Sequence, residues 1–399
     1  MTCANIFLKK IIETCIFQKN VVLLYPNCRL VEVDENIHHI YFSLLRAALW
    51  GQSMKWPTEH TDNLLRINAQ QGTGAMVFPN VLTQEDIPAA AKMQMKGLCL
   101  STMQQQVRLR YTLSAAWRAL TQAGITPVLM KGAGLAALYP DPQMRAWGDI
   151  DLFVGKAQYH PACAVMRDTF PNALKFDEEL DHYKHYNLIA DGISIEVHRI
   201  TIGLHHPLDA LRYERMEAYG VANAREIEID ECPVRIFEAT FNVLFVMLHA
   251  WEHAMTKGAN IRQICDLTLL LHHDAAEIDR LRLKRWLSRL HLTDVWKLYM
   301  WIAVDCLGLP QEEAPLYEPD RQTRAERFVT DMMNGALKPL TNHQSPIKNR
   351  FVRKWYTMQE RLQNARRVGQ YSPAYGQHLQ IETLLHGALR LFAKDRHWE

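Results

Sequence analysis

The chain has 399 residues, of which 48% are hydrophobic, and a formal net charge of +2. This length and composition allow two or three domains with full cores, and the near-neutral charge excludes a strongly basic nucleic-acid coat or an acidic tail as the main function. The eight cysteines are scattered without a CxxC pair, which is typical of reduced thiols. The apolar run at residues 21–25 is too short for a signal peptide or a membrane span, so we expect a cytoplasmic protein without a membrane partner.

Helical patterns dominate the first third of the chain. Residues 1–36 show weak periodicity and are interpreted as an extension of unknown role. Apolar side chains then recur at helical spacing in three stretches, 38–50, 61–71 and 83–96. Ser101 and Gln104 have the spacing of a capping box, which predicts a further helix that begins there and ends at Gly124. Residues 37–126 are therefore predicted to form an N-terminal helical region.

Strand and helix patterns alternate over residues 127–235, which we predict to form one core. The predicted strands lie at 125–130, from Asp149 onward, at 186–189 and at 194–200, with a helix near 161–170. Helical runs dominate again over residues 236–399 and predict a C-terminal helical domain. The fold class predicted is therefore α+β, in which a mixed sheet is flanked by helices from both sides of the chain.

Two acids mark the strand that begins at Asp149. Side chains on a strand alternate between faces, so Asp149 and Asp151 project together while Ile150 packs on the other side. Two close carboxylates repel each other unless a cation lies between them, and Mg²⁺ is a usual partner of such clusters. A third acid, Glu196, shares a strand face with His198, and an adjacent strand could bring it beside the pair. The pattern favours a metal site, although a lone Asp-x-Asp also occurs on many solvated strands.

A glycine turn precedes these strands. Lys131 and Gly132 follow the strand at 125–130, and a helix is predicted to start at Ala133. A glycine turn that enters a helix exposes backbone N–H groups, which can hold a phosphate. The sequence thus predicts a phosphate cradle about one helix and one loop away from the paired acids.

The order of these features resembles the polymerase-beta nucleotidyltransferase superfamily. More closely, residues 129–136, the run Gly148-Asp149-Ile150-Asp151-Leu152 and the run Glu196-Val197-His198 are similar to a bacterial family of uncharacterised nucleotidyltransferases. The similarity is densest over 125–200 and extends more weakly over most of 38–310. It implies a polymerase-beta-like core at 127–235. Ala133 stands where the superfamily commonly has serine, and Ala146 and Trp147 stand where closer relatives often have proline and methionine.

The resemblance also implies an activity and a set of site residues. Asp149, Asp151 and Glu196 would bind Mg²⁺ or Mn²⁺, and Glu196 would help to deprotonate an acceptor hydroxyl. Nucleotide phosphates would contact Lys131, Gly132, Ala133 and Arg145, and the residues expected around this site are His198, His249, Arg262 and Asp266. The implied reaction moves a nucleoside monophosphate from an NTP, with ATP as the expected donor, to a small molecule, sugar, protein or RNA, and releases pyrophosphate.

Other functions stay open at this point. A non-catalytic nucleotide-binding or regulatory module of the same fold would share these residues without turnover. The run from His249 to His253 has the H-x-x-E-H form of a zinc peptidase, but so short a motif arises easily in a chain with 18 histidines. The basic aromatic stretch at 348–367 could bind nucleic acid, whereas a solvated basic helix face is the more common explanation.

Overall fold

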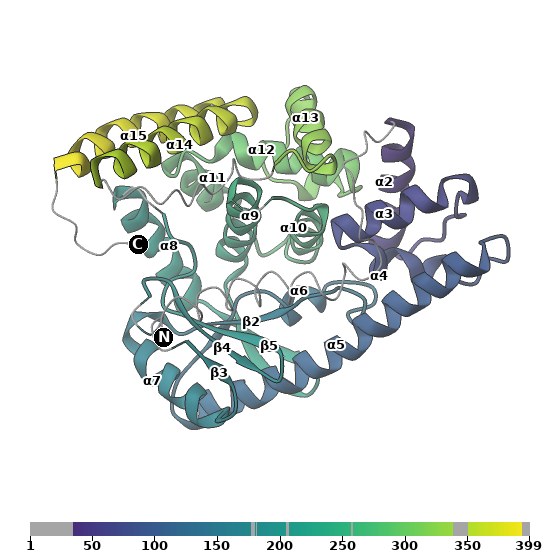
Figure 1. Ribbon diagram of the computed structural model, residues 1–399, viewed down its shortest axis with the longest axis horizontal. Helices are drawn as coiled ribbons and strands as arrows, with labels where there is room; N and C mark the ends of the chain where they lie inside the picture. Colours follow the sequence, from purple (N-terminus) through teal and green to yellow (C-terminus); the bar gives the residue numbers. More distant parts are fainter. Residues whose placement is uncertain are drawn as a thin grey trace.

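The computed structural model describes residues 35–176, 180, 182–204, 207–256, 258–337 and 350–392 (Figure 1). Nearly all of the extension predicted at residues 1–36 lies outside these ranges, as does the start of the basic stretch at 348–367. None of the helices within the described ranges combines the length and the apolar character that crossing a membrane requires.

Helices form the described chain before the first strand. They are α2 (Glu35–Leu49), η2 (Thr58–His60), α3 (Thr61–Gln71), α4 (Gly74–Val77), η3 (Phe78–Asn80) and α5 (Ala89–Gln122). The helix start predicted at Ser101 is wrong, because α5 is continuous over 34 residues and the Ser101 hydroxyl donates to the Leu98 carbonyl inside it. The predicted end is confirmed to within two residues, since α5 ends at Gln122 and Gly124 follows its C-cap residue Ala123 with a φ of 74°.

Strands and helices alternate in the middle of the chain, as predicted. The elements are β1 (Val128–Leu129), α6 (Ala133–Ala136), β2 (Asp149–Phe153), α7 (Gly155–Thr169), β3 (Leu174–Lys175), β4 (His185–Ala190), β5 (Ile193–His198), α8 (Pro207–Ala222), β6 (Arg225–Ile229) and β7 (Cys232–Ile236). Five strands form one sheet in the order β1-β2-β5-β4-β3, and β6 and β7 form a separate hairpin. Only the β2–β5 pair is parallel in the five-stranded sheet, so the sheet is mixed and agrees with the predicted α+β class.

One face of the five-stranded sheet is apolar and is covered by α5 and α7. Ile150 of β2 and Ile195 of β5 are completely buried there, together with Leu109 of α5 and Tyr159 of α7. Figure 1 shows α5 running diagonally beneath the sheet with α7 near its end. Because side chains alternate along a strand, this packing directs the acidic residues of β2 and β5 to the opposite face.

The helices after β7 continue to residue 392. They are α9 (Ala239–Thr256), α10 (Ile261–His273), α11 (Arg280–Arg289), α12 (Thr293–Trp301), the π-helical η5 (Ile302–Cys306), η6 (Gln311–Glu313), η7 (Pro319–Arg321), α13 (Gln322–Met333), α14 (Arg350–Tyr371) and α15 (Pro373–Phe392). Their core includes Phe241 and Phe245 of α9 and Trp296 of α12, all completely buried. In Figure 1, α9 and α10 lie between the sheet and the outer helices, so α9 borders the acidic face.

Candidate functional site

The parallel pairing of β2 with β5 brings two of the predicted acids together. In this register Asp151 lies opposite Glu196, and Asp149 lies opposite Ser194. Directly opposed residues on neighbouring strands project from the same face of a sheet. The structure therefore places Asp149, Asp151 and Glu196 on one face, at the side of the sheet that α9 borders.

Lys131 reaches this acidic face from the turn after β1. The backbone N–H of Met130 donates to the Asp151 carbonyl at 3.1 Å, which continues the β1–β2 ladder up to the turn. Lys131 Nζ then lies 3.0 Å from Asp151 Oδ2 and 3.2 Å from His249 Nε2 of α9. Burial on its own would lower the pKa of Lys131, but the neighbouring carboxylates, Asp151 foremost, raise it, so the side chain stays an ammonium.

The turn at Gly132 has a backbone conformation that suits glycine. Its φ is 61° and its ψ is −116°, and a Cβ built there would lie 2.9 Å from Cε3 of the buried Trp147. Within the described residues, none of the N–H groups of Lys131, Gly132 and Ala133 donates a hydrogen bond. The helix that follows has only four residues, so its macrodipole is small, and the free N–H groups are the feature suited to an anion.

We expect Gly132→Ala to destabilise the chain and to disrupt this turn. The added methyl group forces either the positive φ or the Trp147 ring to change, at a cost of about 1–3 kcal/mol. The measurement is the urea midpoint of unfolding. Gly134→Ala, two residues further on in α6, is the matched control, because its Cβ would make only ordinary van der Waals contacts, of which the nearest is Ile236 Cγ2 at 3.4 Å. If both variants unfold at the parent's midpoint, the packing of Trp147 on Gly132 does not constrain the turn.

His198 bridges two of the carboxylates. Its Nε2 lies 3.1 Å from Asp151 Oδ1 and 3.2 Å from Glu196 Oε2. Burial lowers the pKa of His198, but its hydrogen bonds to the two acids raise it above the usual value. Burial raises the pKa of Asp151, yet Lys131 and His198 together hold it well below its usual range. Burial likewise opposes ionisation of Glu196, whose pKa falls to about 2 because of His198 and His185.

Asp149 has the opposite electrostatic environment. Burial and the charge of Asp151 raise its pKa to about 6. Within the described ranges, no ion pair neutralises its carboxylate. With the three carboxylates ionised, the excess over the Lys131 ammonium is two negative charges when His198 is neutral and one when it is protonated. A carboxylate-rich donor set with this charge fits a divalent cation such as Mg²⁺.

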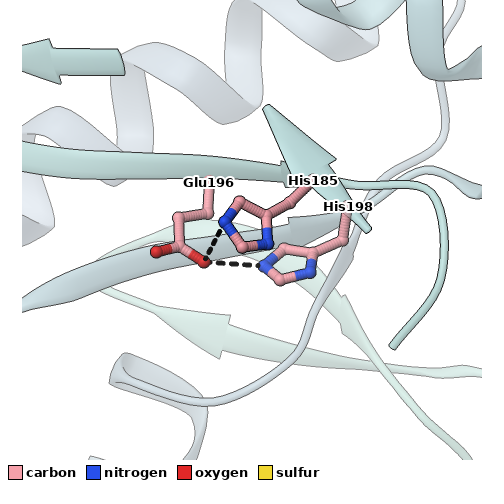
Figure 2. Close-up of side chains that lie close together, drawn as sticks. All are labelled: His185, Glu196 and His198. Carbon is pink, nitrogen blue, oxygen red and sulfur yellow. Dashed lines mark ion pairs between the residues drawn. The ribbon is translucent and has the colours of Figure 1, made fainter. Parts of the chain in front are cut away.

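A histidine that the sequence reasoning missed lies beside Glu196. The antiparallel pairing of β4 with β5 sets His185 opposite His198, and His185 Nε2 lies 3.7 Å from Glu196 Oε2. Within the described residues, His185, Glu196 and His198 form the one group of three potential ligands whose atoms all lie within 4.8 Å of one another (Figure 2). The three predicted carboxylates are not gathered this closely. The alternation of side chains along β4 predicts on which face of the sheet His185 lies, but only the pairing of β4 with β5 shows that His185 is a neighbour of Glu196.

Arg145 is engaged in a buried ion pair. Its Nε donates to Asp266 Oδ1 at 2.9 Å and its Nη2 to Oδ2 at 2.5 Å, and the Tyr139 hydroxyl donates to the same carboxylate at 2.7 Å. Nearby, Arg262 donates to the Ala146 carbonyl. These contacts tie the loop before β2 to α10, so three of the predicted residues lie in one network that positions the loop.

The H-x-x-E-H segment lies on α9 next to Lys131. The rings of His249 and His253 have centroids 4.4 Å apart, and Glu252 pairs with Lys184 at 3.5 Å. Burial and the Lys131 ammonium hold the pKa of His249 well below its usual value. The ammonium beside His249 Nε2 also repels a dication at that nitrogen, which disfavours a zinc ion shared with His253.

Together the fold and the site define a class of protein: an α+β protein with a carboxylate face, a lysine and a glycine turn suited to phosphate and metal ions. The chain belongs to a family described as uncharacterised nucleotidyltransferase, whose model matches residues 57–308, more than half of the chain. The family resemblance in the sequence is thereby confirmed. No curated protein and no solved structure gives a match.

Proposed function

We propose that the chain is a metal-dependent nucleotidyltransferase with a polymerase-beta-like core. It moves a nucleoside monophosphate from an NTP, expected to be ATP, to an acceptor hydroxyl and releases pyrophosphate. One observation carries the proposal: Asp151 lies opposite Glu196 on parallel strands, with the Lys131 ammonium 3.0 Å from Asp151. Membership of a nucleotidyltransferase family supports the same reaction class.

The proposal gives the acidic residues the task of holding the cation. Asp149, Asp151 and Glu196 would hold Mg²⁺ or Mn²⁺, which when bound neutralises phosphate charge and favours ionisation of a hydroxyl. Glu196 stays ionised because its pKa is about 2, so it can accept a hydrogen bond from an acceptor hydroxyl. His198 orients this carboxylate and that of Asp151 by lying between them.

The turn and the loop would bind and position the nucleotide. The free N–H groups of Gly132 and Ala133 and the ammonium of Lys131 are donors suited to phosphate oxygens. The alanine at 133 removes the serine hydroxyl common in the superfamily, so more of this binding falls to Lys131 and the backbone. We assign Arg145 the positioning of the loop before β2, because Asp266 engages its guanidinium.

A product screen tests the proposed reaction. The purified chain is incubated with Mg²⁺, one α-labelled NTP at a time and a cell extract that supplies acceptors. We expect a labelled product whose formation stops when the cation is chelated, with one pyrophosphate released for each label transferred. Nucleotide binding without pyrophosphate release from any acceptor fraction would instead favour the non-catalytic module.

We expect Lys131→Met to weaken ATP binding roughly 10- to 100-fold, because a hydrogen bond to a charged group contributes about 1.5–3 kcal/mol. Isothermal titration with Mg²⁺-ATP measures this change. Lys156→Met on α7 is the control, since that lysine is 57% exposed and α7 covers the apolar side of the sheet. Equal ATP affinity in parent and Lys131→Met would remove Lys131 from the phosphate site.

A further inference from the structure

We propose that His185, Glu196 and His198 form a binding site for a transition metal ion of the Mn²⁺ to Zn²⁺ series. This site shares Glu196 with the carboxylate site of the proposed function, but its other two ligands are histidines instead of Asp149 and Asp151. The existence of the metal site stands on its own geometry. Its use in nucleotidyl transfer rests on the proposed function.

The strand register creates the site. Glu196 and His198 are two residues apart on β5, and His185 on β4 is directly opposite His198, so all three side chains project from one sheet face. The imidazole rings of the two histidines have centroids 4.9 Å apart. Figure 2 shows both rings directing a nitrogen at the same oxygen of Glu196.

The distances between the ligand atoms suit one ion. Glu196 Oε2 lies 3.2 Å from His198 Nε2 and 3.7 Å from His185 Nε2. Ligands bound to one metal at about 2.1 Å are separated from each other by roughly 3.0–3.4 Å at octahedral to tetrahedral angles. The observed spacing is therefore close to a coordination sphere, and the partly exposed side chains of His185 (25%) and Glu196 (22%) leave it open to solvent.

The donor atoms select the class of metal. Two imidazole nitrogens and one carboxylate oxygen suit Zn²⁺, Co²⁺ or Fe²⁺, and Mn²⁺ accepts such mixed sets, whereas Mg²⁺ prefers an all-oxygen shell. Asp149 and Asp151 offer only oxygen atoms. The acidic face thus contains an oxygen end suited to Mg²⁺ and a nitrogen-containing end suited to a softer ion.

The hydrogen bonds within this cluster do not satisfy all of its polar atoms. His198 Nε2 carries at most one hydrogen, yet it lies within 3.2 Å of carboxylate oxygens on both Asp151 and Glu196. The Nδ1 atoms of His185 and His198 are buried without a hydrogen-bond partner in the described part of the chain. A histidine that binds a metal through Nε2 carries its ring proton on Nδ1, and here Nδ1 has no hydrogen-bond acceptor in the described part of the chain. Because such an acceptor normally strengthens metal binding, we expect a Kd on the order of micromolar rather than nanomolar.

The test uses metal ions alone on the full chain after treatment with EDTA. Co²⁺ is titrated in and followed by its visible absorption, which responds to the ligands and the coordination geometry of the ion, and then Zn²⁺ or Mg²⁺ is added in competition. We expect about one Co²⁺ per chain at this site, displaced by Zn²⁺ and not by an equal concentration of Mg²⁺. Displacement by Mg²⁺ as readily as by Zn²⁺ would overturn the proposal.

Variants assign the signal to these residues. His185→Gln should weaken Co²⁺ binding at least roughly tenfold, whereas His160→Gln, at an exposed position on α7, should bind like the parent. His185→Asp keeps three ligands but replaces a nitrogen with an oxygen, so it should shift the preference from Co²⁺ towards Mn²⁺. Parental Co²⁺ affinity in His185→Gln, which remains folded by circular dichroism, would show that the ion binds elsewhere.

The same experiments separate this proposal from the proposed function. Asp149→Asn should keep the Co²⁺ spectrum of the parent, because Asp149 is not one of the three ligands. A parental Co²⁺ site in a chain that transfers no nucleotide would contradict the proposed function and support the metal site. If His185→Gln transfers nucleotide on Mg²⁺ at the parental rate and also binds Co²⁺ like the parent, the result would support the proposed function and contradict the metal site.

Discussion

Asp149→Asn is expected to abolish nucleotidyl transfer and at the same time to raise the melting temperature. Burial and the neighbouring Asp151 raise the pKa of Asp149 to about 6, so its charged form destabilises the folded chain. Asparagine keeps the shape and removes that charge, which also replaces a carboxylate ligand of the proposed cation with a neutral and weaker amide oxygen. We expect a rate loss of at least roughly 10³-fold, since a metal contributes several kcal/mol to such a reaction, and a Tm gain of about 1–3 °C.

The pH dependence gives this prediction a second readout. A raised carboxyl pKa makes the parent lose stability as the pH rises from the usual aspartate value of 3.8 to about 6, and the loss persists above 6. The Tm difference between Asp149→Asn and parent should therefore be largest above pH 6 and shrink below it. Asp168→Asn, at an exposed position on α7, is the control and should change neither Tm nor rate. A variant that transfers nucleotide like the parent would take Asp149 out of the proposed site.

The part of the site that the sequence predicts depends on short-range patterns. Period-two alternation gives the common face of Asp149 and Asp151 on β2, because the apolar Ile150 between them must pack inward. The same rule gives the face of Glu196 on β5. A glycine before a predicted helix identifies the turn at Gly132, where the backbone has a positive φ. These features follow from the residue and its near neighbours, so no tertiary information is needed.

Features that depend on long-range pairing escape such patterns. His185 becomes a neighbour of Glu196 only through the β4–β5 register, and Arg145 meets Asp266 across 121 residues of chain. The capping-box signal at Ser101 failed for a related reason. Packing of α5 against two cores, one with the N-terminal helices and one with the sheet, keeps the helix continuous through that residue. The preference of Ser101 for a helix start contributes less free energy than the burial of side chains along the whole of α5, so the helix continues through this residue.

The largest expected loss of stability comes from removing one partner of the Arg145–Asp266 pair. Both side chains are almost fully buried, at 7% and 5% exposure, and the closest atoms are 2.5 Å apart. Arg145→Met or Asp266→Leu leaves a buried charge without a partner, which typically costs about 3–5 kcal/mol. Urea midpoints and Tm values of both variants measure this cost. Lys156→Met is the matched control, because its ion pair with Glu214 is equally short at 2.6 Å but about half exposed, and we expect a loss below about 1 kcal/mol.

The double variant Arg145→Met, Asp266→Leu distinguishes a positioning role from direct phosphate binding. Because both buried charges leave together, its stability loss should be smaller than that of either single variant, although the Tyr139 hydroxyl loses its acceptor. If Arg145 only positions the loop, the double variant should bind Mg²⁺-ATP within a few-fold of the parent's Kd, in contrast to Lys131→Met. An ATP affinity as weak as that of Lys131→Met would instead give Arg145 the direct phosphate contact that the family resemblance implies. Stability losses that simply add would mean that the two side chains do not act as a pair.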